Sequence, residues 1–434
     1  MALPTAQGRN LRDLMRDRLP AKVFSRLEDA GKLAEQSGVS VFAVGGLVRD
    51  LLMGHTTIDV DIAVEGDGMA FARRLADRHG AGLKIFERFA TAHVVLPDGF
   101  KLDVATARRE NYAHPSALPT VAPASIKDDL YRRDFTINAL AIDLNNHHFG
   151  ELIDYYGGQR DLQQKTIRVL HGQSFVDDPT RLFRAIRYEQ RFGFRTEANT
   201  MRLLKEAAAT DLVHQLSGPR LRNEVMLLLA EKDPHRTIRR MAELDLLRFI
   251  HPRLTLTPPI KVLGAGLTNA IDWWTKRFPD RTLEHPLVYF IALMDGLSAS
   301  AVDAVLKRLA LPNRQADKVR MVKNHLSPAL RILSKRQSLK PSQAYRLFAG
   351  LPDEGLILLA AKHGLKKAQP LLSAYLTTFQ RMKPSLTGED LKKMGLKPGP
   401  LYRKILDRLL DARLNGEVKS EADERGLVKK IAKL

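Results

Sequence analysis

Two aspartates, Asp59 and Asp61, lie one residue apart near the end of the segment VFAVGGLVRDLLMGHTTIDVDIAV, residues 41–64. In a β-strand, residues i and i+2 point to the same face, so a strand over 58–64 places both carboxylates side by side. Adjacent carboxylates repel each other unless a cation neutralises them. Mg²⁺ prefers such oxygen ligands and leaves coordination positions for substrate phosphates. The pair therefore predicts a catalytic Mg²⁺ site that promotes in-line attack at a phosphate.

The residues before this pair are suited to binding the phosphate itself. An apolar strand over 41–44 ends at Gly45-Gly46, and the pattern predicts that a helix begins at once. Backbone N–H groups at a helix N-terminus bind anions, and glycine allows a phosphate to approach them closely. Arg49 lies one turn later and can donate to a phosphate in a bidentate manner. A plain turn would explain the two glycines alone, and an exposed edge strand would explain the two aspartates alone. The order strand, Gly-Gly, helix and strand favours a metal–triphosphate site instead.

Further motifs follow in the same order as in a known family. They are GGLVRD at 45–50, DVD at 59–61, RRDFTINA at 132–139, DYYGG at 154–158 and DDPTR at 177–181. On these motifs the chain resembles the class II tRNA nucleotidyltransferase and bacterial poly(A) polymerase family, within the polymerase-β-like superfamily. Tyr155 replaces the family's proline and Asp177 replaces its glutamate, while Pro219-Arg220 and Glu224 match the next motif loosely.

The resemblance and the local chemistry together define the candidate site. Asp103, between Leu102 and Val104, is a candidate third catalytic carboxylate, although an aspartate at a strand end can also cap a turn. Local capping and packing roles remain open for Asp134 and Asn138, and Arg184 and Arg187 can also form a solvated basic stripe. The residues expected to bind nucleotide are Gly45, Gly46, Arg49, Arg133, Asp134, Asn138, Asp178, Arg181, Arg184 and Arg187.

Asp178 and Arg181 are the candidates for reading the base. On a helix, residues i and i+3 are neighbours. Aspartate accepts hydrogen bonds and arginine donates them, a pattern that suits the amino group and ring nitrogen of cytosine and adenine. Uracil and guanine present the reverse pattern. A surface salt bridge of little energetic value is the alternative explanation, and the motif context favours base reading.

The resemblance implies addition of the 3′-terminal CCA, or part of it, to the tRNA acceptor arm from CTP and ATP, with release of pyrophosphate. Addition of only A or only CC, poly(A) polymerase activity, and non-catalytic RNA binding are the alternatives. The net charge of +20, from 69 Lys and Arg against 49 Asp and Glu, agrees with a polyanionic partner. The absence of cysteine excludes disulfides, thiol catalysis and cysteine-ligated zinc. No stretch is apolar enough to cross a membrane, so we expect a soluble cytoplasmic protein with no obligate protein partner.

These residues need an α+β scaffold, in which a small mixed-sheet nucleotidyltransferase head precedes an all-helical body. Short β-like runs predict about five strands, at 41–44, 58–64, 84–87, 92–96 and 102–105, with helices at 9–38 and 67–79. Residues 111–125 are rich in proline, alanine and serine and predict a loop. Breaks between helices are expected at 262–266, 310–314 and 339–342. We therefore expect an N-terminal helical segment (1–38), the head (39–160), a nucleotide-selecting neck (161–255) and a tRNA-binding body and tail (256–434).

Overall fold

The structure is a computed structural model that describes residues 9–56, 58–114, 116–117, 119–255, 258–335 and 338–432, with backbone only for 258–263. Parts of the predicted N-terminal segment, loop and body therefore lie outside the described residues. The chain forms two compact units. The first comprises residues 1–224, 231–233 and 243–245, and the second comprises 225–230, 234–242 and 246–434.

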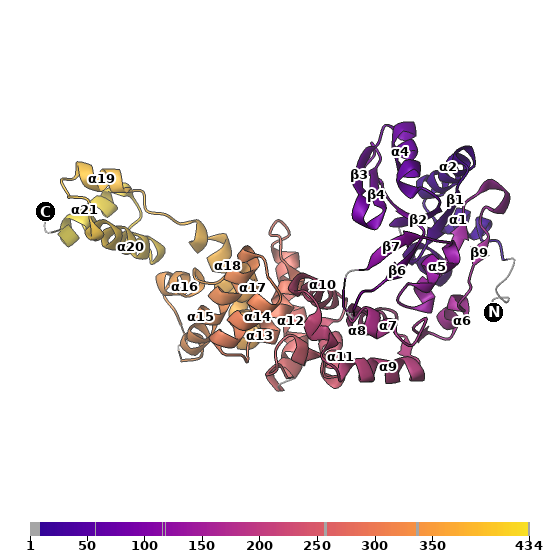
Figure 1. Ribbon diagram of the computed structural model, residues 1–434. Helices are drawn as coiled ribbons and strands as arrows, with labels where there is room; N and C mark the ends of the chain where they lie inside the picture. The colour runs from indigo at the N-terminus through magenta and orange to yellow at the C-terminus, as the bar shows by residue number, and fades with distance from the viewer. Residues whose placement is uncertain are drawn as a thin grey trace. The chain divides into compact units, whose positions relative to one another are not determined.

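A seven-stranded sheet with the order β3-β4-β5-β2-β1-β8-β9 organises the first unit (Figure 1). Its strands are β1 Ser40–Val44, β2 Val60–Glu65, β3 Gly82–Phe86, β4 Thr91–Val95, β5 Lys101–Thr106, β8 Ala141–Asp143 and β9 Leu152–Ile153. The β2–β5 pair is parallel and the other pairs are antiparallel. The expected mixed sheet is confirmed, but the strand number was too low, because β8 and β9 are too short to show an alternating pattern.

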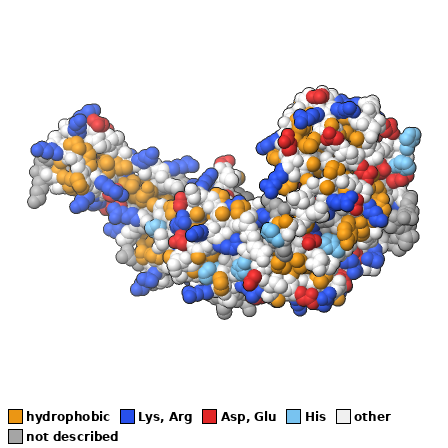
Figure 2. Space-filling view, viewed as in Figure 1, with side chains coloured by type: hydrophobic (Ala, Val, Ile, Leu, Met, Phe, Trp, Pro, Cys, Tyr) orange, Lys and Arg blue, Asp and Glu red, His pale blue; other side chains and the backbone are white. Residues whose placement is uncertain are grey.

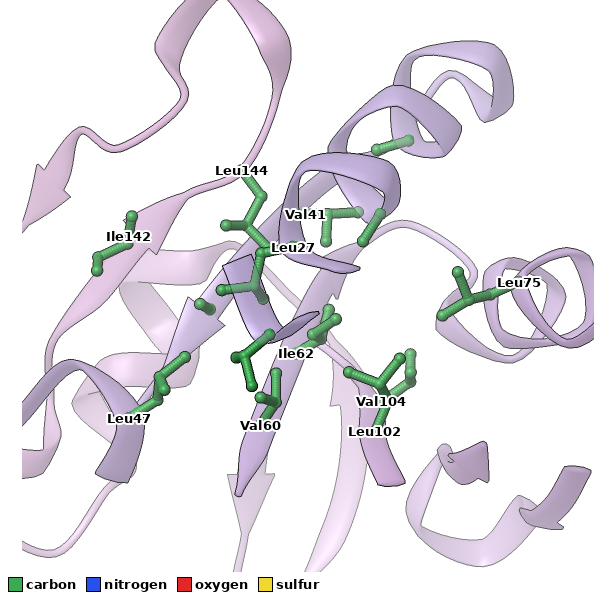
Figure 3. Close-up of a cluster of buried hydrophobic side chains, with 14 of the residues drawn as sticks. Leu27, Val41, Leu47, Val60, Ile62, Leu75, Leu102, Val104, Ile142 and Leu144 are labelled. Atoms are coloured by element: carbon green, nitrogen blue, oxygen red, sulfur yellow. The ribbon is translucent and has the colours of Figure 1, made fainter. Parts of the chain in front are cut away.

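The alternation of side chains along β2 places Val60, Ile62 and Val64 on one face of the strand and the candidate catalytic residue Asp61 on the other. Val60, Ile62 and Val64 are buried in one core cluster, which also contains Leu27 from α2 (Ala21–Ser37) and Leu75 from α4 (Gly68–His79). Figure 3 shows Val60 and Ile62 among these side chains. Because the side-chain period of a strand is two, Asp61 points to the opposite face. The core thus fixes the direction in which Asp61 points.

Two predicted elements of the head differ from the structure. The helix expected over 9–38 is divided into α1 (Arg12–Arg18) and α2, because Leu19 is extended at ψ 146° before Pro20. The segment 111–125 is not a loop throughout, because β6 (Arg108–Asn111) pairs with β7 (Thr120–Pro123) as an antiparallel hairpin. The expected helix at 67–79 is confirmed as α4, capped by the Asp67 carboxylate.

Helices and short strands complete the first unit. They are α3 Gly46–Met53, α5 Ile126–Tyr131, α6 Gly158–Gln163, α7 Ser174–Asp177, α8 Thr180–Phe192, α9 Ala198–Ala208 and the parallel pair β10 Thr166–Ile167 and β11 Arg195–Thr196. The helix α10 (Gly218–Leu229) contributes residues to both units. The 3₁₀ helices within the described residues are η1 Glu87–Phe89, η2 Thr136–Asn138, η3 Asn146–His148, η4 Leu212–Gln215, η5 Leu246–Phe249 and η6 Phe379–Arg381.

The second unit is helical, which confirms the expected fold class. Its helices are α11 Pro234–Glu243, α12 Pro258–Arg277, α13 His285–Met294, α14 Ala299–Arg308, α15 Asn313–Lys335, α16 Pro341–Phe348, α17 Asp353–His363, α18 Leu365–Thr377, α19 Gly388–Lys393, α20 Pro400–Leu414 and α21 Glu421–Ala432. The breaks expected at 310–314 and 339–342 are confirmed. The break at 262–266 was wrong, since α12 continues and Gly264 instead lets the His235 ring pack closely.

Lys and Arg side chains are spread over the visible surface of both units (Figure 2). None of the helices in the described ranges combines the length and hydropathy that a membrane span requires.

Candidate active site

A cavity of about 500 Å³ in the first unit brings together most of the predicted site residues. Its lining consists of Gly45, Gly46, Arg49, Asp61, Glu110, Tyr112, Pro119, Arg132, Arg133, Asp134, Asn138, Asp178, Arg181, Arg184, Tyr188 and Arg220. Asp59, Asp103 and Arg187 are the predicted site residues that do not line it. Six of the ten charged side chains in this lining are arginines, which suits an anionic ligand.

The Gly45-Gly46 turn joins β1 to α3 and gives an arginine close access to the backbone. Gly45 has φ 71° and ψ −119°, a conformation that residues with a Cβ rarely adopt. A Cβ at this position would lie 2.7 Å from Nη1 of Arg133. The turn therefore places the N-terminus of α3 and the Arg133 guanidinium together, which is suitable for a phosphate.

Asp59, Asp61 and Asp103 lie near enough to one another for the charges of Asp59 and Asp103 to act on Asp61. Asp61 of β2 lies opposite Asp103 of β5 in the parallel register, and Asp59 lies just before β2. Partial burial and the charges of Asp103 and Asp59 raise the pKa of Asp61, and the positive charge of Arg133 opposes them. A carboxylate whose ionised form is disfavoured by its like-charged neighbours is stabilised by a bound cation.

The donor set for that cation is limited. In the described part of the chain, no three His, Asp or Glu side chains are arranged as a metal-binding group. Asp103 forms a hydrogen bond with His93, with 2.5 Å between the carboxylate Oδ1 and the imidazole Nδ1. Asp59 and Asp61 therefore fit a cation that completes its shell with substrate oxygens and water, as Mg²⁺ does.

Asp61 also lies between two cavities. A second cavity of about 260 Å³ shares Asp61, Arg132 and Arg133 with the first and is lined by Asp103 and His93 as well. Arg133 is fixed by its bond to Asp129 Oδ2, at 2.9 Å. Asp61 is therefore accessible from both cavities.

A buried polar network connects α3 with α8. Asn138 Nδ2 donates to Asp134 (2.9 Å), and Arg49 Nη1 donates to Asn138 Oδ1 (2.6 Å). Burial would raise the pKa of Asp134, but Arg184 and the Asn138 hydrogen bond hold it at about 2. Arg184 donates from Nε to Asp134 Oδ2 at 2.8 Å. Asp134 and Asn138 thus position arginines at the cavity.

The Arg49 side chain is more buried than expected for a residue that was predicted to donate to a phosphate. Its side chain also donates to Asp50, and its guanidinium lies 4.8 Å from the ring centre of Phe192. It is only 6% exposed. Its contribution to phosphate binding remains a prediction.

Asp178 and Arg181 both line the cavity, but they are not neighbours on one helix. Asp178 has an extended backbone before α8, so the helical i, i+3 argument was wrong in its geometry. Asp178 Oδ1 accepts from Arg220 Nη2 at 2.8 Å, and Arg181 donates to Ser174 Oγ and to the Arg132 carbonyl, both at 2.6 Å. Each side chain is therefore fixed by a separate partner.

Sequence reasoning left several cavity residues out of the candidate site. Arg220 donates to the Ser116 carbonyl (2.9 Å) as well as to Asp178, so it connects residues between β6 and β7 with the proposed base reader. Tyr112 donates to Glu110 at 2.9 Å. The loose motif around Arg220 was the available signal for that residue.

Arg187, a predicted nucleotide-binding residue, is buried beside Glu224, with 3.6 Å between their side chains, and lies outside the cavity lining.

Comparison with known proteins agrees with this arrangement. Residues 41–168 match the poly A polymerase head domain, and residues 193–256 match the probable RNA and SrmB-binding site of polymerase A. An A-adding tRNA nucleotidyltransferase of Halalkalibacterium halodurans is 33% identical over 95% of this chain and 94% of its own length. The chain belongs to the tRNA nucleotidyltransferase family.

Other members of the tRNA nucleotidyltransferase family extend the comparison. An A-adding tRNA nucleotidyltransferase of Geobacter sulfurreducens is 43% identical over 96% of this chain, but the match covers 48% of that protein. The chain thus spans about half the length of the first curated relatives it matches. A solved apo structure of a CCA-adding enzyme matches with a TM-score of 0.84 and 36% identity, covering 98% of this chain and 99% of that one.

Proposed function

We propose that this protein adds the 3′-terminal CCA, or part of it, to tRNA without a nucleic-acid template, using CTP and ATP. The observation that carries this proposal is the cavity that places Asp61, the Gly45-Gly46 turn and the Asp178–Arg181 pair in one compact unit. The names of the relatives support the same reaction class, and solved relatives are described as complexes with tRNA, ATP and CTP.

In the proposed reaction, the 3′-hydroxyl of tRNA attacks the α-phosphate of the bound nucleotide. A new phosphodiester bond forms, the bond to the β-phosphate breaks, and pyrophosphate leaves. The N-terminus of α3, Arg133 and Arg184 hold the triphosphate, while the second cavity beside Asp103 admits the RNA end. A divalent cation, which we propose to be Mg²⁺, would be held by Asp59 and Asp61 and would neutralise charge at the reacting oxygens.

Base selection is assigned to Asp178 and Arg181. The hydrogen bonds of the Asp178 carboxylate within the described residues all involve Oδ1, so Oδ2 is suited to accept from a base amino group. Arg181 has five N–H donors and can serve a ring nitrogen in addition to its protein partners. Cytosine and adenine present this pair of groups, and uracil and guanine do not.

Addition of the terminal A alone is the second candidate. The relatives with 43% and 33% identity are both named A-adding enzymes, whereas a relative from Deinococcus radiodurans with 32% identity is named CC-adding. Poly(A) polymerase activity and non-catalytic RNA binding are the remaining alternatives. The presence of both aspartates in the sequence, with Asp61 in the cavity lining, argues against a purely binding role.

One assay separates these functions. The full chain is incubated with tRNA transcripts that end before CCA, after the first C or after CC, each with labelled CTP or ATP. Ordered incorporation of both nucleotides supports complete CCA addition, and incorporation of A only after CC supports the A-adding function. Long A tails on unrelated RNAs would identify a poly(A) polymerase, and absence of incorporation with retained tRNA binding would contradict the proposal.

The tRNA acceptor arm is the proposed macromolecular partner, bound through phosphate contacts of basic side chains in the helical body. The net charge of +20 supports this binding mode, and the affinity is expected to fall steeply with salt. We retain a cytoplasmic location as a prediction, since the substrates are cytoplasmic metabolites and RNA.

A further inference from the structure

Four aromatic rings form a continuous array on the first unit, outside the cavity lining. They come from the end of α5, the turn after β9 and the turn before α7 (Figure 1). The ring centres of Tyr155 and Tyr156 lie 6.2 Å apart, those of Tyr156 and Tyr131 lie 5.6 Å apart, and those of Tyr131 and His171 lie 5.2 Å apart. Segments distant in sequence therefore present their rings on one surface.

Two members of this array are well exposed to solvent. Tyr131 is 46% exposed and Tyr155 is 49% exposed. The other large apolar side chains exposed in the described ranges are aliphatic. Tyr155 packs edge-on against Tyr156, and Tyr131 lies tilted against both Tyr156 and His171. Tyrosines that are held by ring contacts lose little conformational entropy when a further ring stacks on them. The array is therefore prepared to bind flat aromatic groups.

The position and charge of the array favour RNA bases over an apolar protein surface. Tyr131 directly precedes Arg132, a cavity residue, and the His171 ring lies 3.9 Å from Asp177, which precedes the cavity residue Asp178. The Lys127 ammonium lies 5.7 Å from the ring centre of Tyr155 at the other end. Stacking aromatics accompanied by cations are characteristic of surfaces that bind single-stranded nucleic acid.

The ring of His171 supports this interpretation. Burial and the positive charge of Arg181 lower the pKa of His171, so the imidazole is uncharged at neutral pH and packs as an aromatic ring. The influence of Arg181 also indicates that the array begins close to the proposed base-reading residues.

We propose that Tyr131, Tyr155, Tyr156 and His171 form a stacking platform for unpaired bases of the RNA substrate. The proposal rests on the proposed function for the identity of that RNA. The platform would hold unpaired nucleotides near the cavity by ring contacts that tolerate any base, while Lys127 contacts the backbone. It would thereby lower the KM for RNA without changing which nucleotide the cavity selects.

The test replaces the two exposed tyrosines in the full chain. Binding of a fluorescent short oligocytidylate is compared for the unsubstituted protein, the Tyr131→Leu/Tyr155→Leu variant and the Tyr131→Phe/Tyr155→Phe variant. The leucine variant keeps apolar side chains but removes the rings, and it is expected to bind at least about fivefold more weakly, the lower limit for one base–ring stack. The phenylalanine variant keeps the rings and is expected to bind like the unsubstituted protein.

Steady-state kinetics with tRNA distinguish this inference from the proposed function. The leucine variant is expected to have a raised KM for tRNA and an unchanged KM for the nucleotide. Oligocytidylate binding that is equal in all three proteins would overturn the platform, whether or not the protein adds nucleotides. If the unsubstituted protein adds none but the leucine variant still loses RNA binding, the platform is supported and the proposed activity fails.

Discussion

Replacing Gly45 with alanine is expected to impair both folding stability and nucleotide binding. Gly45 has φ 71° and ψ −119°, and backbone strain of this kind costs about 1–3 kcal/mol in a residue with a Cβ. The new methyl group would also lie 2.7 Å from Arg133 Nη1, so the guanidinium must move. Loss of one charged hydrogen bond to a triphosphate costs about 1.5–3 kcal/mol, which corresponds to a decrease of about 10- to 150-fold in kcat/KM.

Gly38 provides a matched control for the backbone effect. It follows α2 with φ 65°, and a Cβ there would have no neighbour within 4 Å. Gly38→Ala is therefore expected to lower stability by about 1–2 kcal/mol without affecting the cavity. Thermal unfolding and nucleotide-incorporation kinetics are measured for both variants. If Gly45→Ala keeps the kcat/KM of the unsubstituted protein, or if Gly38→Ala loses as much activity, the assignment of Arg133 to the triphosphate is refuted.

Three further predictions follow from the site. Asp61→Asn is expected to abolish incorporation and to leave tRNA affinity nearly unchanged in a filter-binding assay; normal turnover would contradict the metal-site assignment. Arg220→Met removes the 2.8 Å bond to Asp178 and is expected to raise incorporation of UTP and GTP relative to CTP and ATP by about tenfold, the effect of about 1.4 kcal/mol in selectivity, and unchanged selectivity would exclude this positioning role. The pKa of Asp134 is lowered to about 2, so its ion pair with Arg184 stabilises the fold above about pH 4 and loses that contribution as the pH falls toward 2. The free energy of unfolding should therefore decrease by about 2 kcal/mol over this range, and Asp134→Asn should show a smaller pH dependence than the unsubstituted protein.

Local sequence patterns predicted those strands and helices of the head that have a clear apolar periodicity of their own. The alternating run around Asp61 and the helix that follows Asp67 both appear in the structure, because apolar periodicity reports directly on burial. Strands β8 and β9 contain only three and two residues, so their pairing depends on neighbouring strands rather than on their own pattern. The break predicted at 262–266 was wrong because Gly264, within this segment, allows close packing of His235, a residue distant in sequence.

The sequence by itself predicted the kind of chemistry that we propose for this protein. The types and order of Asp59, Asp61, Gly45 and Gly46 indicated a metal and a phosphate, and the later motifs indicated the family. Only the tertiary structure decided how these groups are held. It showed that Asp61 lies between two cavities and that Asp178 is fixed by Arg220 rather than paired with Arg181. Such partners come from segments far apart in the chain, and hydrogen-bond geometry between them is set by packing rather than by spacing.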